Sequence, residues 1–245
     1  MTYFCPDVHP DDAFSKVPYE KGSTFLWYLE GIVGEQKMEE FLRFYYKKFA
    51  LKSIDSDDFK QTFMEYFKEI DSVHEIDWNT WFYEPGLPIW KPDFDDSLAK
   101  VCWELASQWL DWDSSTPTPA LFEDAFNNLT PKQKQEFLGT LLTGRPLEIA
   151  KIEKMSELYL LDQSTNVEHL LLWIRLGLKA RWEPSVVEAL NLVNRVGRWN
   201  IVRPLYRDLY DWEEKRQVAI DNFIAHGNKL MYGVAVKVSQ ILFAN

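Results

Sequence analysis

The segment HPDDAFSKVPYEKG, residues 9–22, gathers side chains that could take part in acid–base chemistry. It contains Asp11 and Asp12, and Tyr19 and Glu20 follow in the same stretch. A carboxylate can direct a water molecule, and a tyrosine hydroxyl can donate to a developing oxyanion. The same residues also fit an acid-rich helix start with a half-buried tyrosine, because acids suit the positive end of a helix. Their spacing alone leaves both interpretations open.

A group of arginines in RVGRWNIVRPLYRDL is the second candidate. Guanidinium groups suit bidentate binding of a carboxylate, so this group could hold an acidic substrate. Gly197 and Pro204 predict a loop over residues 198–203, with a helix that starts at Pro204. The alternative is salt bridging on a solvated face. The arginines are Arg195, Arg198, Arg203 and Arg207, and the acids that could pair with them are Glu183, Asp208 and Asp211.

Metal and nucleotide chemistry find no support in the motifs of this sequence. A zinc peptidase helix carries two histidines four residues apart, but in HEIDW the position four after His74 is Trp78, which cannot bind a metal. We find no GxSxG, Walker or GxGxxG pattern. We therefore expect this chain to bind no metal or cofactor by itself. The histidines stand singly, at His9, His74, His169 and His226.

Charge and cysteine content limit the partners and the compartment. The formal net charge is -11 and the pI is about 4.9, so the chain repels nucleic acid and anionic lipid. Cys5 and Cys102 are too few for a disulfide framework, which favours a reducing compartment. The sequence shows no signal peptide and no membrane span. We expect a cytoplasmic protein that binds neither nucleic acid nor membrane.

The candidate residues near Tyr19 and Arg198 are expected to lie on or between helices. Apolar side chains recur at spacings of three and four along most of the chain, which predicts helices. In the first helix, expected from Pro18 to Gly34, this stripe is Phe25, Leu26, Leu29, Ile32 and Val33. Asp55 or Ser56 can cap a later helix, and Pro131 and Pro184 suit first helical positions. Further helices are predicted over residues 37–50, 55–70, 77–82, 97–110, 120–127, 131–142, 147–160, 167–179, 184–196, 204–212, 215–226 and 234–243.

The helical pattern breaks once, in YEPGLPIWKPDFDD, where three prolines and a glycine exclude a helix and indicate a domain boundary. Elsewhere, connections of a few residues between medium-length helices predict antiparallel neighbours. We predict an all-α chain whose second part stacks helix pairs as an α-solenoid of the armadillo or HEAT kind. No strict sequence repeat accompanies this pattern.

Taken together and in order, several segments resemble a known family. They are VPYEKG, FLRFYYKKF, KSIDSDDF, DWNTWFYEPGLPIWKP and GRWNIVRPLYRDL. The sequence is similar over essentially its whole length to the C-terminal part of the leukotriene-A(4) hydrolase family and its aminopeptidase relatives, which are zinc enzymes of the gluzincin class. The resemblance implies three regions: the end of a thermolysin-like catalytic domain over 1–85, a proline-rich linker over 86–96, and an α-solenoid domain over 97–245.

The resemblance also implies roles for individual residues. Tyr19 matches the family tyrosine that stabilises the oxyanion formed when zinc-bound water attacks the peptide carbonyl. Asp11 matches the aspartate that directs water in members acting on a lipid epoxide, and Pro10 is placed beside the substrate. Arg198 matches the arginine that anchors a substrate carboxylate. Asn200, two residues on, falls at a further substrate-binding position.

Two positions depart from the family pattern. Phe14 stands where leukotriene hydrolase has a second tyrosine, so any role of that hydroxyl is lost. Asn200 replaces a lysine, which weakens the anchoring of an anionic substrate. The change at Asn200 counts against turnover of a lipid epoxide more than against cleavage of peptides. The HExxH helix, the downstream zinc glutamate and the loop that grips the free amine belong to the preceding part of the family proteins and are absent here.

Two hypotheses follow. In the first, the chain is the C-terminal portion of a cytoplasmic zinc aminopeptidase that acts on short peptides and could also hydrolyse a leukotriene epoxide; without the N-terminal half it should be inactive and bind no zinc. In the second, it is a natural short helical-repeat module that binds a protein or peptide without catalysis.

Overall fold

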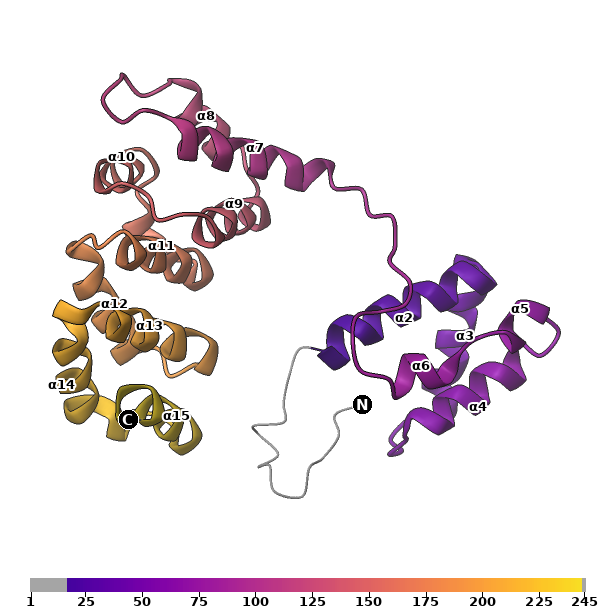
Figure 1. Cartoon of the computed structure of the whole chain (residues 1–245). Coiled ribbons are helices and arrows are strands. Elements are labelled where there is room, and N and C mark those ends of the chain that lie inside the picture. The colour runs from indigo at the N-terminus through magenta and orange to yellow at the C-terminus, as the bar shows by residue number, and fades with distance from the viewer. Residues whose placement is uncertain (1–16, 244–245) are drawn as a thin grey trace. The chain divides into compact units, whose positions relative to one another are not determined.

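The computed structural model describes residues 17–243, which are helical apart from their connections (Figure 1). The chain divides into two compact units, Met1–Phe94 and Asp95–Asn245, which are described separately below. No strand occurs among the described residues, so the prediction of an all-α chain is confirmed. None of the described helices combines the length and the apolar composition needed to cross a bilayer.

The first unit packs its helices around an aromatic core. The ring of Phe25 lies 4.8 Å from Trp81 and 5.3 Å from Trp78, and Phe41 lies 5.1 Å from Phe63 between ring centroids. Leu26, which the sequence placed on the buried stripe, is instead 39% exposed. The helices are α2 (Val17–Val33), α3 (Glu35–Lys48), α4 (Ser56–Tyr66), α5 (Asp71–His74) and α6 (Trp78–Phe82).

Side-chain caps fix where these helices begin. Asp55 accepts hydrogen bonds from the backbone of Asp57 and Asp58, so it is the cap of α4 that the sequence offered as one of two choices. Asp77 caps α6 in the same way through Thr80. The predicted helix over 55–70 was too long, because α4 ends at Tyr66 and the short helix α5, which was not predicted, follows it.

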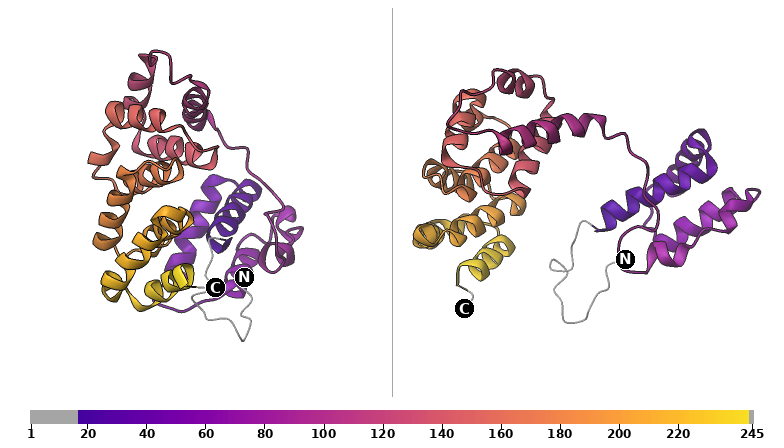
Figure 2. Two further views of the ribbon diagram at one scale, coloured as in Figure 1. Left: turned by 60° about the vertical axis from the view of Figure 1, so that its left-hand side comes forward. Right: turned by 45° about the horizontal axis from the view of Figure 1, so that its top comes forward.

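The second unit stacks its helices in two layers. Helices α7, α9, α11, α13 and α15 pack consecutively against one another, while α8, α10, α12 and α14 line the other side, as the views in Figures 1 and 2 show. This is the predicted solenoid. Its members are α7 (Ser97–Asp111), α8 (Leu121–Asn127), α9 (Pro131–Thr143), α10 (Ile149–Tyr159), η1 (Leu161–Gln163), α11 (Val167–Lys179), α12 (Pro184–Arg195), α13 (Trp199–Asp211), η2 (Glu213–Lys215), α14 (Arg216–His226), η3 (Gly227–Lys229) and α15 (Tyr232–Phe243).

Two of the predicted proline starts are confirmed, and one is wrong. Pro131 and Pro184 occupy the first turns of α9 and α12, where a missing N–H costs nothing. Pro204, however, lies inside α13, so the predicted loop over residues 198–203 is helical from Trp199. The reason is packing. Buried side chains on both sides of the proline share one face of α13, and their burial offsets the lost hydrogen bond. They are Ile201, Val202, Leu205, Tyr206 and Leu209.

Candidate functional site

Tyr19 lies in the first turn of α2, on the surface of the first unit. Its side chain is 65% exposed, whereas Phe25, Leu29 and Val33 carry the burial of the same helix. Tyr19 lies about 120° around the helix from Phe25, because each helical residue advances by about 100°. The interpretation of Tyr19 as a half-buried side chain is therefore wrong for this unit, and its phenol ring is accessible.

Lys21, two residues further on, fixes the start of α2 against the end of α6. Its Nζ donates to the carbonyl of Thr80 at 3.0 Å and to the carbonyl of Glu84 at 2.7 Å. Carbonyls at the end of a helix lack partners within the helix, so a cation there satisfies them and complements the helix dipole. Lys21 thereby holds the backbone that carries Tyr19. This role could not be predicted from the sequence, since nothing local pairs residue 21 with residues 80 and 84.

The other residues expected in the first part of the site are Pro10 and Asp11, together with Phe14. All three lie outside the described residues 17–243. Their roles therefore stay predictions from the resemblance.

Arg198 is the residue that precedes α13 in the second unit, and its side chain is exposed. Its carbonyl accepts the first backbone hydrogen bonds of the helix, from Ile201 and Val202. Its guanidinium makes no hydrogen bond or ion pair with another described residue. Asn200 follows on the first turn of α13 and is also exposed. A guanidinium beside the positive end of a helix suits a carboxylate ligand.

Two of the three acids that could have neutralised the arginine group have other partners. Asp208 pairs with Arg175, with an Nε to Oδ2 distance of 2.6 Å. Glu183 pairs with Lys215 at 2.6 Å. The salt-bridge alternative for Arg198 thus finds no support among the described residues. Arg203 instead lies over the ring of Trp199, 5.1 Å from its centroid.

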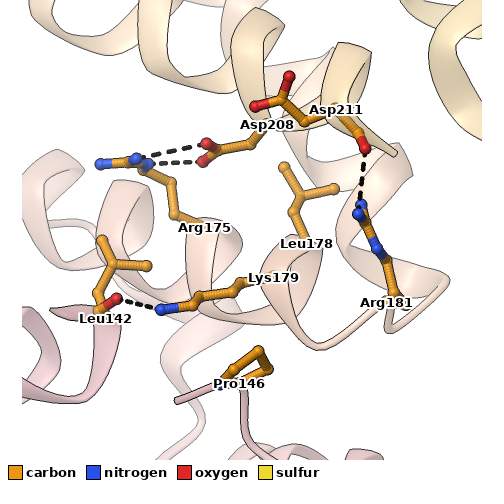
Figure 3. Close-up of a pocket in the computed structure, with 8 residues that line it drawn as sticks. All are labelled: Leu142, Pro146, Arg175, Leu178, Lys179, Arg181, Asp208 and Asp211. Carbon is orange, nitrogen blue, oxygen red and sulfur yellow. Dashed lines mark hydrogen bonds and ion pairs between the residues drawn. The ribbon is translucent and has the colours of Figure 1, made fainter. Parts of the chain in front are cut away.

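A cavity of about 400 Å³ in the second unit lies where α9, α11 and α13 end (Figure 3). Its cations are committed to the protein. Lys179 donates to the carbonyls of Leu142 at 2.7 Å and Gly144 at 2.5 Å, and Arg181 donates to the carbonyl of Asp211 at 3.1 Å. These contacts satisfy carbonyls at the C-terminal ends of the helices. We therefore interpret the cavity as part of the packing between helices of the solenoid and not as a ligand-binding site.

Asp208 closes the same cavity through its ion pair with Arg175. Burial raises the pKa of its carboxyl group above the usual value, and the hydrogen bond and charge of Arg175 act in the opposite direction. From the sequence, Asp208 was predicted only as a partner for the arginines near residue 200. Because Arg175 lies a full helix earlier in the chain, no sequence spacing could identify it as the actual partner.

No three histidine, cysteine, aspartate or glutamate side chains gather in a metal-binding arrangement within residues 17–243. The Nε2 atom of His74 lies 2.9 Å from the carbonyl oxygen of Lys68, and that of His169 lies 2.8 Å from the carbonyl oxygen of Pro131. Both imidazoles therefore have structural partners. The described residues do not fit a catalytic zinc site.

Comparison with protein-family models gives two matches. Residues 129–242 match the C-terminal domain described as "Leukotriene A4 hydrolase, C-terminal", and residues 5–81 match the "Peptidase family M1 domain". The first of these ranges includes Arg198, and the second includes Tyr19.

Curated relatives match most of this chain but only a part of their own length. Leucine aminopeptidase 2 of Emericella nidulans is 43% identical over 222 residues, which is 89% of this chain and 35% of that protein. Leukotriene A-4 hydrolase of Xenopus laevis is 35% identical over 229 residues, covering 91% of this chain and 37% of the relative. The chain thus spans about a third of the length of these relatives.

Among solved structures, yeast LTA4 hydrolase in complex with Bestatin matches with a TM-score of 0.85 and 28% identity. The match covers 97% of this chain and 41% of the yeast chain. The native yeast enzyme matches with a TM-score of 0.81. The helical fold described above is therefore the fold of the corresponding part of these enzymes.

Proposed function

Because the chain belongs to the leukotriene A4 hydrolase and aminopeptidase family, we propose that it is the C-terminal portion of a zinc aminopeptidase that releases N-terminal amino acids from short peptides. The observation that carries this proposal is the extent of the similarity, 43% identity to Leucine aminopeptidase 2 over 89% of the chain. The longer protein would supply the zinc ligands, which the described residues do not provide.

We propose that Tyr19 acts on the carbonyl that is being cleaved. When bound in the complete protein, zinc supplies the activated water for this reaction. The hydroxyl of Tyr19 then donates a hydrogen bond to the oxygen that gains negative charge as the carbonyl becomes tetrahedral. A donor aimed at that charge lowers the barrier more than it strengthens ground-state binding. The surface position of Tyr19 and the anchoring of α2 by Lys21 support this role.

Arg198 would bind the C-terminal carboxylate of the peptide substrate. Its guanidinium is exposed, has no acid partner among the described residues, and stands at the positive end of α13. A fork of N–H donors in this setting suits the carboxylate of a short peptide. Asn200 can add a neutral hydrogen bond but no charge. This pattern favours peptides over an anionic lipid epoxide, although Asp11 keeps the residue type that epoxide hydrolysis needs.

We also propose a cytoplasmic location. The support is that Cys102 is a buried free thiol, as expected in a reducing compartment. The partners implied by this function are the peptide substrate and the remaining N-terminal half of the enzyme.

A fusion protein tests the proposal. In it, this chain replaces the matching C-terminal part of Leucine aminopeptidase 2 from Emericella nidulans. We expect the fusion to hold about one zinc ion and to release leucine from a leucyl peptide, while the chain alone does neither. Stoichiometric zinc and peptidase activity in the isolated chain would overturn the assignment of the zinc ligands to the rest of the protein.

The size of the protein in its source cells separates this function from the noncatalytic module. An antibody against residues 91–245 should detect a band much heavier than 29.0 kDa if the zinc-binding half is attached. A single band at 29.0 kDa would instead favour the short interaction module.

A further inference from the structure

A second cleft in the solenoid is lined by basic side chains that form no ion pair or hydrogen bond with other described residues. It has a volume of about 110 Å³ and is lined by residues from the ends of α12 and α14 and from α13. Arg195, His226 and Lys229 line it. None of the three makes an ion pair or a hydrogen bond with another described residue. No aspartate or glutamate lines this cleft.

This arrangement differs from the other helix ends of the solenoid. Basic residues in the last turn of a helix usually serve its carbonyls and its dipole. Lys179 and Arg181 do so in the larger cavity, where each donates to backbone carbonyls of a neighbouring helix. Arg195 and Lys229 have no such acceptor within residues 17–243. In a chain of net charge -11, three uncommitted cationic or titratable groups in one cleft need a different explanation.

The back of the cleft contains a buried hydroxyl group. Tyr206 is 1% exposed, and its oxygen accepts a hydrogen bond from Nδ2 of Asn222 at 2.8 Å. Asn222 is in turn paired with Asn194, which also lines the cleft, through two hydrogen bonds of 2.9 and 3.2 Å. These amides hydrogen-bond the hydroxyl and hold this wall of the cleft in place.

We infer that this cleft is a binding site for a phosphate-type oxyanion, either free phosphate or the phosphate group of a small ester. Arg195 and Lys229 supply charge at the rim, and His226 supplies a ring N–H. The cleft also adjoins the N-terminal end of α13, since Gly197 lies on its wall two residues before the helix. Positive helix ends and several converging donors are what phosphate oxygens require. The site does not depend on the proposed peptidase function.

Thermal unfolding of the complete chain in phosphate tests this inference. A ligand that binds only the folded state raises the melting temperature as its concentration passes the dissociation constant. Millimolar inorganic phosphate should therefore raise the melting temperature above that in sodium chloride of the same ionic strength. Titration with O-phosphoserine beside inorganic phosphate distinguishes the two sources, because the one that acts at lower concentration is the better ligand.

Matched charge removals separate the site from general salt effects. Arg195→Gln and Lys229→Gln change exposed side chains, so both variants should fold, and each should weaken phosphate binding about tenfold. Arg203→Gln removes the same charge outside the cleft and should leave phosphate binding unchanged. The inference is overturned if phosphate does no more than sodium chloride, or if Arg195→Gln and Arg203→Gln respond alike.

Discussion

The buried Nζ of Lys151 donates to the carbonyl of Leu110 at 2.8 Å and to that of Trp109 at 3.1 Å, across more than forty residues of sequence. Lys151 is only 4% exposed. It closes the end of α7 as Lys179 closes the end of α9. Cations from later helices thus satisfy the terminal carbonyls of earlier ones, which ties successive pairs of the solenoid together.

Replacing Lys151 with methionine keeps most of the side-chain volume and removes the donor. The free energy of unfolding should fall by about 2 kcal/mol, because the buried carbonyl of Trp109 loses its charged partner and that of Leu110 keeps only Arg145. Urea denaturation measures this change. Lys154→Met is the matched control on the same helix, since Lys154 pairs with Glu157 at the surface, and it should change stability by less than about 0.5 kcal/mol. Equal losses in the two variants would argue against the capping role.

Gly177 allows α11 to approach the start of α12 closely. A Cβ atom at this position would lie 2.7 Å from the Cβ atom of Ser185, which is fully buried. Gly177→Ala should therefore lower the free energy of unfolding by about 1–3 kcal/mol. Gly139→Ala, inside α9 with no atom within 4 Å of the added carbon, should raise it by up to about 1 kcal/mol. Stabilisation by both substitutions would contradict the close packing of α11 and α12.

Glu188 makes stability depend on pH. Burial, and secondarily the charge of Asp162, raise the pKa of its carboxyl group, and its Oε2 atom has no hydrogen-bond partner among the described residues. The folded chain therefore holds this proton more tightly than the unfolded chain. Its contribution to stability is present below the ordinary glutamate pKa and is lost as the pH rises through the folded-state pKa.

Glu188→Gln removes this titration. The variant should be more stable than the parent at neutral pH, and the difference should disappear below about pH 4, where glutamate is protonated in both states. Urea denaturation at the two pH values measures the difference. Glu213→Gln, at an exposed position of η2, should give no comparable difference. A constant gap between Glu188→Gln and the parent at both pH values would rule out titration of Glu188 as its cause.

Arg198 can be tested with a pair of substrates in the fusion protein. Arg198→Gln should raise the KM for a tripeptide with a free carboxylate by about tenfold or more, since a charged hydrogen-bond pair is lost. The same variant should leave the KM for the corresponding peptide amide unchanged. Arg203→Gln is the matched control and should affect neither substrate. Equal effects of Arg198→Gln on acid and amide would show that the guanidinium does not bind the carboxylate.

Local signals account for most of what the sequence predicted correctly about the fold. Pro131 with its cap Thr130 fixes the start of α9, and Asp55 does the same for α4. Pro204 shows the limit of this reasoning. A proline is a local signal for a helix start, but the burial of residues on both sides of Pro204 stabilises a helix that continues past it.

The candidate site was predicted mainly through the family resemblance. Residue types near Tyr19 and Arg198 suggested chemistry, yet the same spacing fitted a structural role equally well. Long-range contacts separate these interpretations. Asp208 was a plausible partner of the arginine group, but its carboxylate forms its ion pair with Arg175, 33 residues earlier. The hydrogen bonds from Lys21 to the carbonyl of Thr80 and from Lys151 to the carbonyl of Leu110 could not be predicted for the same reason. Only the folded structure brings each lysine close to a carbonyl that is distant in the sequence.

The turnover number of Tyr19→Phe in the fusion protein tests the central claim most directly. Tyr19 lies outside the hydrophobic core of the first unit and Tyr19→Phe removes a single oxygen atom, so zinc content and melting temperature should stay unchanged. Tyr46→Phe, at a 73% exposed position of α3, is the matched control. If Tyr19 stabilises the oxyanion, kcat for release of leucine falls about 100- to 1000-fold in Tyr19→Phe, with little change in KM and no effect in Tyr46→Phe. A kcat equal to that of the parent fusion would contradict the catalytic role of Tyr19.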